Sequence, residues 1–152
     1  MQRHIVPHVV TGEQQLAMLP RAASVAEAAK LMHRRQISAV MIVEEGQLLG
    51  IFTERDLSRC IAMCLELPSI PLGLVMTRRP KTIRPDETAM QALARMQEGN
   101  FRHLPVVDGT TVVGMVSARD LFASVRRELE QDVCARQSFV KTESYELAHA
   151  AV

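Results

Sequence analysis

Gly50-Ile51-Phe52-Thr53-Glu54-Arg55-Asp56 occurs twice in this chain, because it returns 64 positions later as Gly114-Met115-Val116-Ser117-Ala118-Arg119-Asp120. Sliding the chain against itself by the same 64 positions, without a gap, aligns further matched residues in both halves, among them Met32 with Met96. A fixed period of this kind indicates a repeated supersecondary unit whose copies bury their apolar faces against one another. The sequence therefore predicts one folded unit built from two copies of the same motif.

The composition agrees with such a unit. The chain has 152 residues, of which 47% are hydrophobic, so two copies together can bury one core. Eighteen basic and seventeen acidic residues leave a net charge of +1, without the basic excess typical of nucleic-acid binding. No apolar run approaches the roughly 20 residues of a membrane span, and the three cysteines form no disulfide framework. We therefore expect a cytoplasmic protein that binds neither nucleic acid nor membrane.

Within each copy the hydrophobic pattern changes period in the same order. A helix begins at a capping box, formed by Ser24 and Glu27 in the first copy and by Thr88 and Gln91 in the second. Two short apolar runs around a glycine-containing turn then predict a β-hairpin, and the repeated motif opens a second helix. In the second copy we expect this helix to end near Glu130. Each copy therefore reads as strand, helix, strand, strand, helix, which is an α/β (α+β) arrangement.

The boundaries of the copies follow from a segment rich in proline and glycine. We expect residues 5–64 to form the first copy, residues 65–75 to form a linker and residues 76–131 to form the second copy. Residues 132–152 then remain as a tail or an additional helix.

The repeated motif allows two interpretations. A hydroxyl residue three positions before an aspartate, directly after a strand, is typical of a helix N-cap with an acid that complements the helix dipole. The same geometry suits a ligand, since free N–H groups, a hydroxyl and a nearby arginine make an anion site, while the aspartate can accept both hydroxyls of a ribose. Gly50 and Gly114 would let a planar base approach the end of the strand closely. Phosphate and ribose together indicate a nucleotide.

On these residues the chain resembles a tandem pair of cystathionine β-synthase (CBS) domains, the regulatory unit called a Bateman module. Besides the two motifs, the resemblance rests on Met76-Thr77, on Thr82-Ile83-Arg84-Pro85-Asp86 and on Phe101-Arg102-His103-Leu104-Pro105-Val106-Val107-Asp108. It implies two βαββα repeats related by a pseudo-twofold axis, with two clefts for adenosine-containing ligands such as AMP, ADP, ATP, NAD(H) or S-adenosylmethionine. It also implies that such modules pair into a disk-like homodimer.

The resemblance assigns roles to particular residues. Asp56 and Asp120 would hold ribose hydroxyls. Thr53 and Ser117 would lie beside the ribose or the phosphates. Backbone contacts to the base are expected around Thr82, Ile83, Val40 and Leu104. The positions expected to bind the nucleotide are Thr53, Arg55, Asp56, Thr82, Ile83, Arg102, His103, Pro105, Ser117, Arg119 and Asp120.

The two copies differ at one pair of positions with chemical consequences. Arg102-His103 in the second copy takes the place of Ser38-Ala39 in the first. These basic side chains are either solvated loop charges or phosphate ligands, since a guanidinium offers a fixed fork for phosphate oxygens. A cleft that they face should favour ligands with more phosphate charge, and the two clefts should then differ.

We therefore expect a non-enzymatic regulatory module that senses an adenine nucleotide, has no catalytic cofactor, forms a homodimer and acts in trans on an unidentified protein. The chain carries no nucleophile elbow, P-loop or zinc motif, and Cys60 with Cys64 lacks further metal ligands. Two alternatives stay open. One is a structural dimerisation module with vestigial clefts, and the other is an enzyme that acts on the bound nucleotide.

Overall fold

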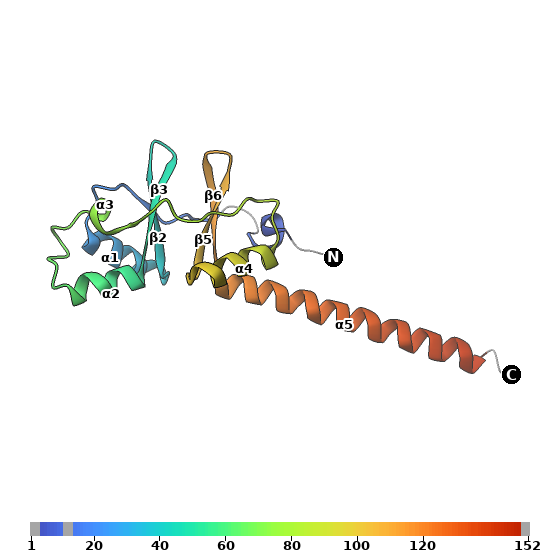
Figure 1. Ribbon diagram of the computed structural model, residues 1–152. Coiled ribbons are helices and arrows are strands. Elements are labelled where there is room, and N and C mark those ends of the chain that lie inside the picture. The colour runs from blue at the N-terminus through green and yellow to red at the C-terminus, as the bar shows by residue number, and fades with distance from the viewer. Residues whose placement is uncertain (1–3, 11–13, 150–152) are drawn as a thin grey trace.

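The computed structural model of the chain describes residues 4–10 and 14–149, with side chains described as far as residue 134. Two β-hairpins lie side by side at the centre, with helices beneath them and one long helix that leaves the body (Figure 1). One hairpin belongs to each copy of the repeat. We call the two copies, with their hairpins and helices, the first half and the second half.

The elements follow the predicted order. The first half contains β1 (Met18–Leu19), α1 (Val25–Arg35), β2 (Ala39–Glu44), β3 (Gln47–Thr53) and α2 (Glu54–Ala62). The second half contains α4 (Ala89–Gly99), β5 (His103–Asp108), β6 (Thr111–Ser117) and α5 (Ala118–His149). Three further elements precede the halves or connect them: η1 (Ile5–Val9), α3 (Leu72–Val75) and β4 (Thr77–Arg78). The predicted α+β fold of two repeats is confirmed, although the first strand of the second half is reduced to one parallel bridge between Ile83 and Val106.

Local structure is closely matched between the halves. The capping boxes predicted at Ser24 and Thr88 both form, and each hydroxyl accepts the backbone N–H of the third helical residue at 3.2 Å. Both of these helices end in a left-handed residue, Gln36 at φ 53° and Asn100 at φ 51°. Both hairpins also carry a register shift at the same repeat position. Short-range sequence signals therefore produce the same local structure twice.

The sheets show how the halves are joined. The first sheet has the order β1-β2-β3-β4, and the second consists of β5 and β6. β4 belongs to the second copy in sequence, but it pairs with β3 of the first half, with Arg78 opposite Gly50 and Thr77 opposite Ile51. The chain therefore passes from the first half to the second after β4 and before α4.

Each half is completed by the segment that precedes the other half in the sequence, and we call these two segments, η1 and α3, the leading segments. Leu72 of α3 is fully buried in the core of the first half, whereas Ile5 of η1 is fully buried in the core of the second half. The N–H groups of Leu72 and Ile5 donate to equivalent carbonyls, those of Ala23 and Glu87, each at 2.8 Å. Accordingly, the N-terminal segment lies beside the second half and α3 lies beside the first (Figure 1). Residues 65–75, predicted as a linker, thus help to complete the core of the first half.

The two motif glycines lie against these crossing segments. A Cβ atom at Gly50 would lie 2.5 Å from Met76 Sδ and 2.8 Å from the carbonyl oxygen of Thr77. A Cβ atom at Gly114 would lie 3.2 Å from Gln14 Oε1. The absence of a side chain at Gly50 therefore lets the crossing segment at Met76 and Thr77 approach β3, and Gly114 lies beside the side chain of Gln14.

The last helix is longer than predicted. α5 continues to His149 rather than ending near Glu130, because no proline or glycine interrupts it, whereas the chain after α2 turns at Cys64, whose φ is 54°. Residues 132–149, predicted as a tail or an additional helix, form the outer part of α5, and residues 150–152 lie outside the described residues. Neither α5 nor any other described helix is long and apolar enough to cross a bilayer.

Candidate functional site

A cleft of about 730 Å³ lies at the junction of the two halves. This volume is typical of small-molecule sites. The first half contributes the residues before β1, the end of α1 and the starts of β2 and α2. The second half contributes the start of β5, the end of β6 and the start of α5. The lining residues with polar or charged groups include His33, Ser38, Glu54, His103, Ser117, Arg119 and Asp120. We call this space the junction cleft.

The start of α5 places a carboxylate in the junction cleft. Asp120 Oδ2 accepts hydrogen bonds from the N–H of Ser117 at 3.0 Å and from its hydroxyl at 2.6 Å. The N–H of Asp120 donates back to Ser117 Oγ at 3.2 Å, so the motif is a helix cap. No partner is found for Asp120 Oδ1 among the described residues, and the side chain is exposed. The capping role therefore leaves one carboxylate oxygen free to meet a ligand.

A histidine and a serine from equivalent regions of the two copies meet across the junction. His103 Nε2 and Ser38 Oγ are 2.8 Å apart. Burial lowers the pKa of His103 below its ordinary value of 6.5, and the neighbouring Arg102 lowers it further, although Glu54 and Asp120 oppose this shift. His103 is therefore neutral at pH 7 and acts in the cleft as a hydrogen-bonding group rather than as a cation.

The structure places the two residues of the basic pair Arg102-His103 differently. Of the basic pair, only His103 lines the cleft, whereas Arg102 is exposed and lies outside the lining. The lining carries two carboxylates, Glu54 and Asp120, against one guanidinium, that of Arg119. Among these three side chains the acidic ones therefore outnumber the basic one.

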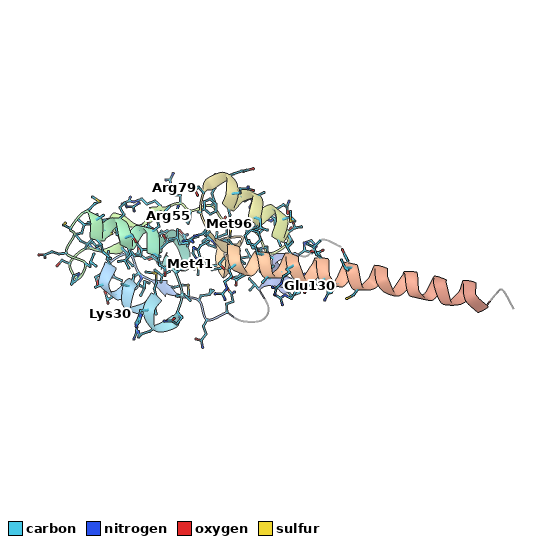
Figure 2. All side chains as sticks on the ribbon, turned by 90° about the horizontal axis from the view of Figure 1, so that it is seen from below. Lys30, Met41, Arg55, Arg79, Met96 and Glu130 are labelled. Carbon is cyan, nitrogen blue, oxygen red and sulfur yellow. The ribbon has the colours of Figure 1, made fainter. Side chains whose placement is uncertain are left out.

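The first copy of the motif uses its side chains differently. Asp56 Oδ2 accepts from the N–H and the hydroxyl of Thr53, both at 2.9 Å, which repeats the cap. Asp56 Oδ1 accepts from Arg59 Nη2 at 2.9 Å, and the carboxylate is buried. Arg55, labelled in Figure 2, donates to the carbonyl of Asn100 at 2.8 Å. These groups are occupied within the protein.

The remaining predicted residues lie apart from the junction cleft. Thr82 lines a separate hollow of about 490 Å³, and its carbonyl accepts from Arg95 at 2.9 Å. Ile83 is buried in the core of the second half, and its N–H donates to the carbonyl of the buried Pro105 at 3.0 Å. All three residues are thus engaged in the structure of the second half.

Several lining residues are not among the predicted site positions. They include Leu16 and Ala17 before β1, Met32 and His33 in α1, and Met115 in β6. The 64-residue period could have indicated Leu16 and Ala17. It aligns Thr82-Ile83, where contacts to the base were expected, with Met18-Leu19, which directly follow Leu16 and Ala17. The backbone positions expected at the base, Val40 and Leu104, are fully buried in the cores of their halves.

Comparisons with known proteins support the repeat assignment. The CBS domain family pattern matches residues 3–63 and 72–127. CBS domain-containing protein CBSCBSPB5 of Arabidopsis thaliana is 35% identical over 112 residues, which are 72% of this chain and 20% of that protein. The chain therefore spans about a fifth of the length of the curated relatives it matches first.

Solved structures give the same result. A proposed signal-transduction protein with CBS domains from Burkholderia ambifaria MC40-6 superposes with a TM-score of 0.76 at 27% identity, over 81% of this chain and 93% of that one. The CBS domain pair of protein MJ0100, in complex with 5′-methylthioadenosine and S-adenosyl-L-methionine, superposes with a TM-score of 0.74 at 25% identity, over 84% of this chain and 99% of that one. The present chain thus belongs to the CBS domain family, and its two halves are a tandem pair of CBS domains.

Proposed function

We propose that the chain is a regulatory module that binds one adenosine-containing ligand in the junction cleft. The observation that carries this proposal is the position of Asp120, whose Oδ1 lacks a described partner in a cleft of about 730 Å³ between two CBS domains. A carboxylate oxygen in such a place can accept the hydroxyl hydrogens of a ribose. The adenosine compounds bound to the CBS pair of MJ0100 support the same ligand class.

The charge balance narrows the ligand class further. Arg119 can pair with one phosphate or carboxylate group, whereas Glu54 and Asp120 repel additional negative charge. His103 adds no positive charge at pH 7, because burial lowers its pKa. We therefore favour AMP, 5′-methylthioadenosine or S-adenosylmethionine over ADP and ATP. The preference for more phosphate charge was expected only for a cleft that Arg102 and His103 both face, and Arg102 is not among the residues that line this cleft.

The cleft also suggests how binding regulates. Its walls come from both halves, so a bound ligand that contacts both walls stabilises one relative packing of the two domains over others. We propose that a partner protein reads this packing in trans, so that the module reports the level of its ligand, as an energy or nucleotide sensor does.

We also propose that the chain forms a homodimer. Large apolar side chains remain exposed on α2 and α5, with Ile61 and Met63 on or directly after α2 and Phe122 and Leu129 on α5 all about 60% exposed. A second copy of the chain can cover such a surface in a symmetric interface. Light scattering that gives only the 16.9 kDa monomer at micromolar concentration would contradict this proposal.

Calorimetry and thermal unfolding test the ligand proposal. We expect AMP, 5′-methylthioadenosine or S-adenosylmethionine to bind at one site per chain and ATP to bind more weakly. A ligand at 100 times its dissociation constant adds about 2.7 kcal/mol of stability, which raises the unfolding midpoint by roughly 5–10 °C. Asp120→Ala should weaken binding more than tenfold, because hydrogen bonds to a charged acceptor contribute roughly 1.5–3 kcal/mol each.

Two outcomes would count against this function. An Asp120→Ala variant that loses about 1 kcal/mol of stability while keeping its ligand affinity would leave Asp120 with the capping role alone. A protein that dimerises but binds none of the adenosine compounds would favour the structural dimerisation module instead.

A further inference from the structure

The two motif aspartates begin with the same local bonds. In each motif, Oδ2 of the aspartate accepts from the N–H and the hydroxyl of the residue that caps the helix. The two donor distances are both 2.9 Å at Asp56, and they are 3.0 and 2.6 Å at Asp120. Any functional difference between the two carboxylates therefore depends on Oδ1.

Oδ1 is occupied in only one of the two motifs. At Asp56 it accepts from Arg59 Nη2 at 2.9 Å, and the Asp56 side chain is 6% exposed. The same Arg59 nitrogen donates to the carbonyl of Val75 at 3.0 Å, which ties the guanidinium to the end of α3. At Asp120 the side chain is exposed and Oδ1 has no partner among the described residues.

The sequence origin of this difference is a single repeat position. Arg59 lies three residues after Asp56, so its side chain reaches the carboxylate along one face of α2. The position 64 residues later, three after Asp120, is Ala123. An alanine cannot reach the carboxylate, so Asp120 stays open to the junction cleft.

A second contact also distinguishes the first motif from the second. Arg55 Nη1 donates to the carbonyl of Asn100 at 2.8 Å and ties the start of α2 to the end of α4. The equivalent residue, Arg119, lines the open junction cleft instead. Thr53, Arg55 and Asp56 line neither the junction cleft nor the hollow at Thr82.

We infer that the chain has one open adenosine site, at Asp120, and one latent site, at Asp56, and that the residues at positions 59 and 123 decide which is open. A ribose hydroxyl is a neutral donor, and it does not displace a guanidinium from a buried carboxylate. Removal of that guanidinium frees Oδ1, and the same side chain placed at position 123 occupies Oδ1 of Asp120. This inference rests on the proposed function, since it uses the same ribose contact.

A reciprocal exchange of the two residues tests the inference. Binding of AMP, 5′-methylthioadenosine and S-adenosylmethionine is measured by calorimetry on the full chain. Wild type should bind one molecule per chain, Arg59→Ala should bind two, and Ala123→Arg should bind more than tenfold more weakly than wild type. The double variant should again bind one molecule, and adding Asp56→Ala should abolish that binding. Arg126→Ala, which removes an exposed arginine of α5, serves as the matched control and should resemble wild type.

Hydrogen exchange on the wild type gives a second measurement that does not depend on folding of the variants. Bound ligand should protect the amides of residues 117–121 and leave those of residues 53–57 unchanged. Equal protection of both segments, or an unchanged affinity of folded Ala123→Arg, would overturn the inference while leaving the proposed function in place. A wild type that binds none of the three compounds would instead overturn the proposed function, and this inference with it.

Discussion

The two halves of the molecule have the same local structure but different surroundings. Their first helices begin with the same capping box, and both hairpins shift register at the same repeat position. Yet the carboxylate of Asp56 is buried against Arg59, whereas that of Asp120 is exposed in the junction cleft. A duplicated sequence thus retains its fold through many short-range signals, while single side chains change what each copy can bind.

The largest effect is expected from breaking the exchange of leading segments. Ile5→Ala and Leu72→Ala should each reduce the free energy of unfolding by about 2–5 kcal/mol, because both side chains are fully buried. Hydrogen exchange should show faster exchange in β5 and β6 for Ile5→Ala, and in β2 and β3 for Leu72→Ala. The neighbouring exposed residues give matched controls, since Val6→Ala and Leu74→Ala should change stability by less than about 0.5 kcal/mol. If Ile5→Ala loosened the first half, the exchanged arrangement would be wrong.

A smaller difference in the free energy of unfolding is expected between alanine substitutions at the two motif glycines. Gly50→Ala should destabilise the fold by about 1–3 kcal/mol, because the new Cβ would lie 2.8 Å from the backbone oxygen of Thr77. Gly114→Ala should lose less than about 1 kcal/mol, because the nearest atom belongs to the flexible side chain of Gln14 at 3.2 Å. Urea denaturation measures both values. Equal losses for the two variants would show that the crossing segments approach both strands equally closely.

A third comparison concerns equivalent buried positions on α2 and α5. Cys60 is buried in the first half, and its counterpart Ser124 is fully buried, with no hydrogen-bond partner for its hydroxyl among the described residues. Since an unsatisfied buried hydroxyl destabilises a fold, Ser124→Ala should raise the free energy of unfolding by about 1 kcal/mol. Ser58→Ala is the control, because the hydroxyl of Ser58 donates to the carbonyl of Glu54 at 3.0 Å and its loss should bring no gain. A loss of stability in Ser124→Ala would argue for a partner of that hydroxyl.

The smallest effect should come from pH, through His103, whose counterpart in the first half is Ala39. Burial lowers the pKa of His103 below 6.5, so between the lowered value and 6.5 the unfolded chain binds more protons than the folded chain. Stability from this group is full above about pH 6.5 and falls as the pH drops through the folded pKa. The difference in unfolding free energy between wild type and His103→Gln should therefore change between pH 7.5 and pH 5.5, to the disadvantage of wild type at the lower pH. A difference that stays constant over this range would contradict the assignment.

Much of the architecture could be predicted because its causes are short-range. Ser24 and Thr88 cap helices through residues three positions away, and the hairpins are set by adjacent strands and their turns. The end of α5 was harder to predict, since a helix without proline or glycine carries no stop signal. The neighbours of Gly50 and Gly114 could not be predicted, because the groups that approach these glycines come from other parts of the chain.

By itself, the sequence determined the duplication, the α+β repeat, the helix caps and the motif aspartates, because each depends on residues a few positions apart or on a regular period. Only the tertiary structure decided that Ile5 and Leu72 exchange halves, that His103 meets Ser38 and that Arg102 stays outside the cleft. These contacts join residues tens of positions apart, and their formation depends on how two complete units pack. The cleft itself exists only where the halves meet, so no segment of the chain contains it.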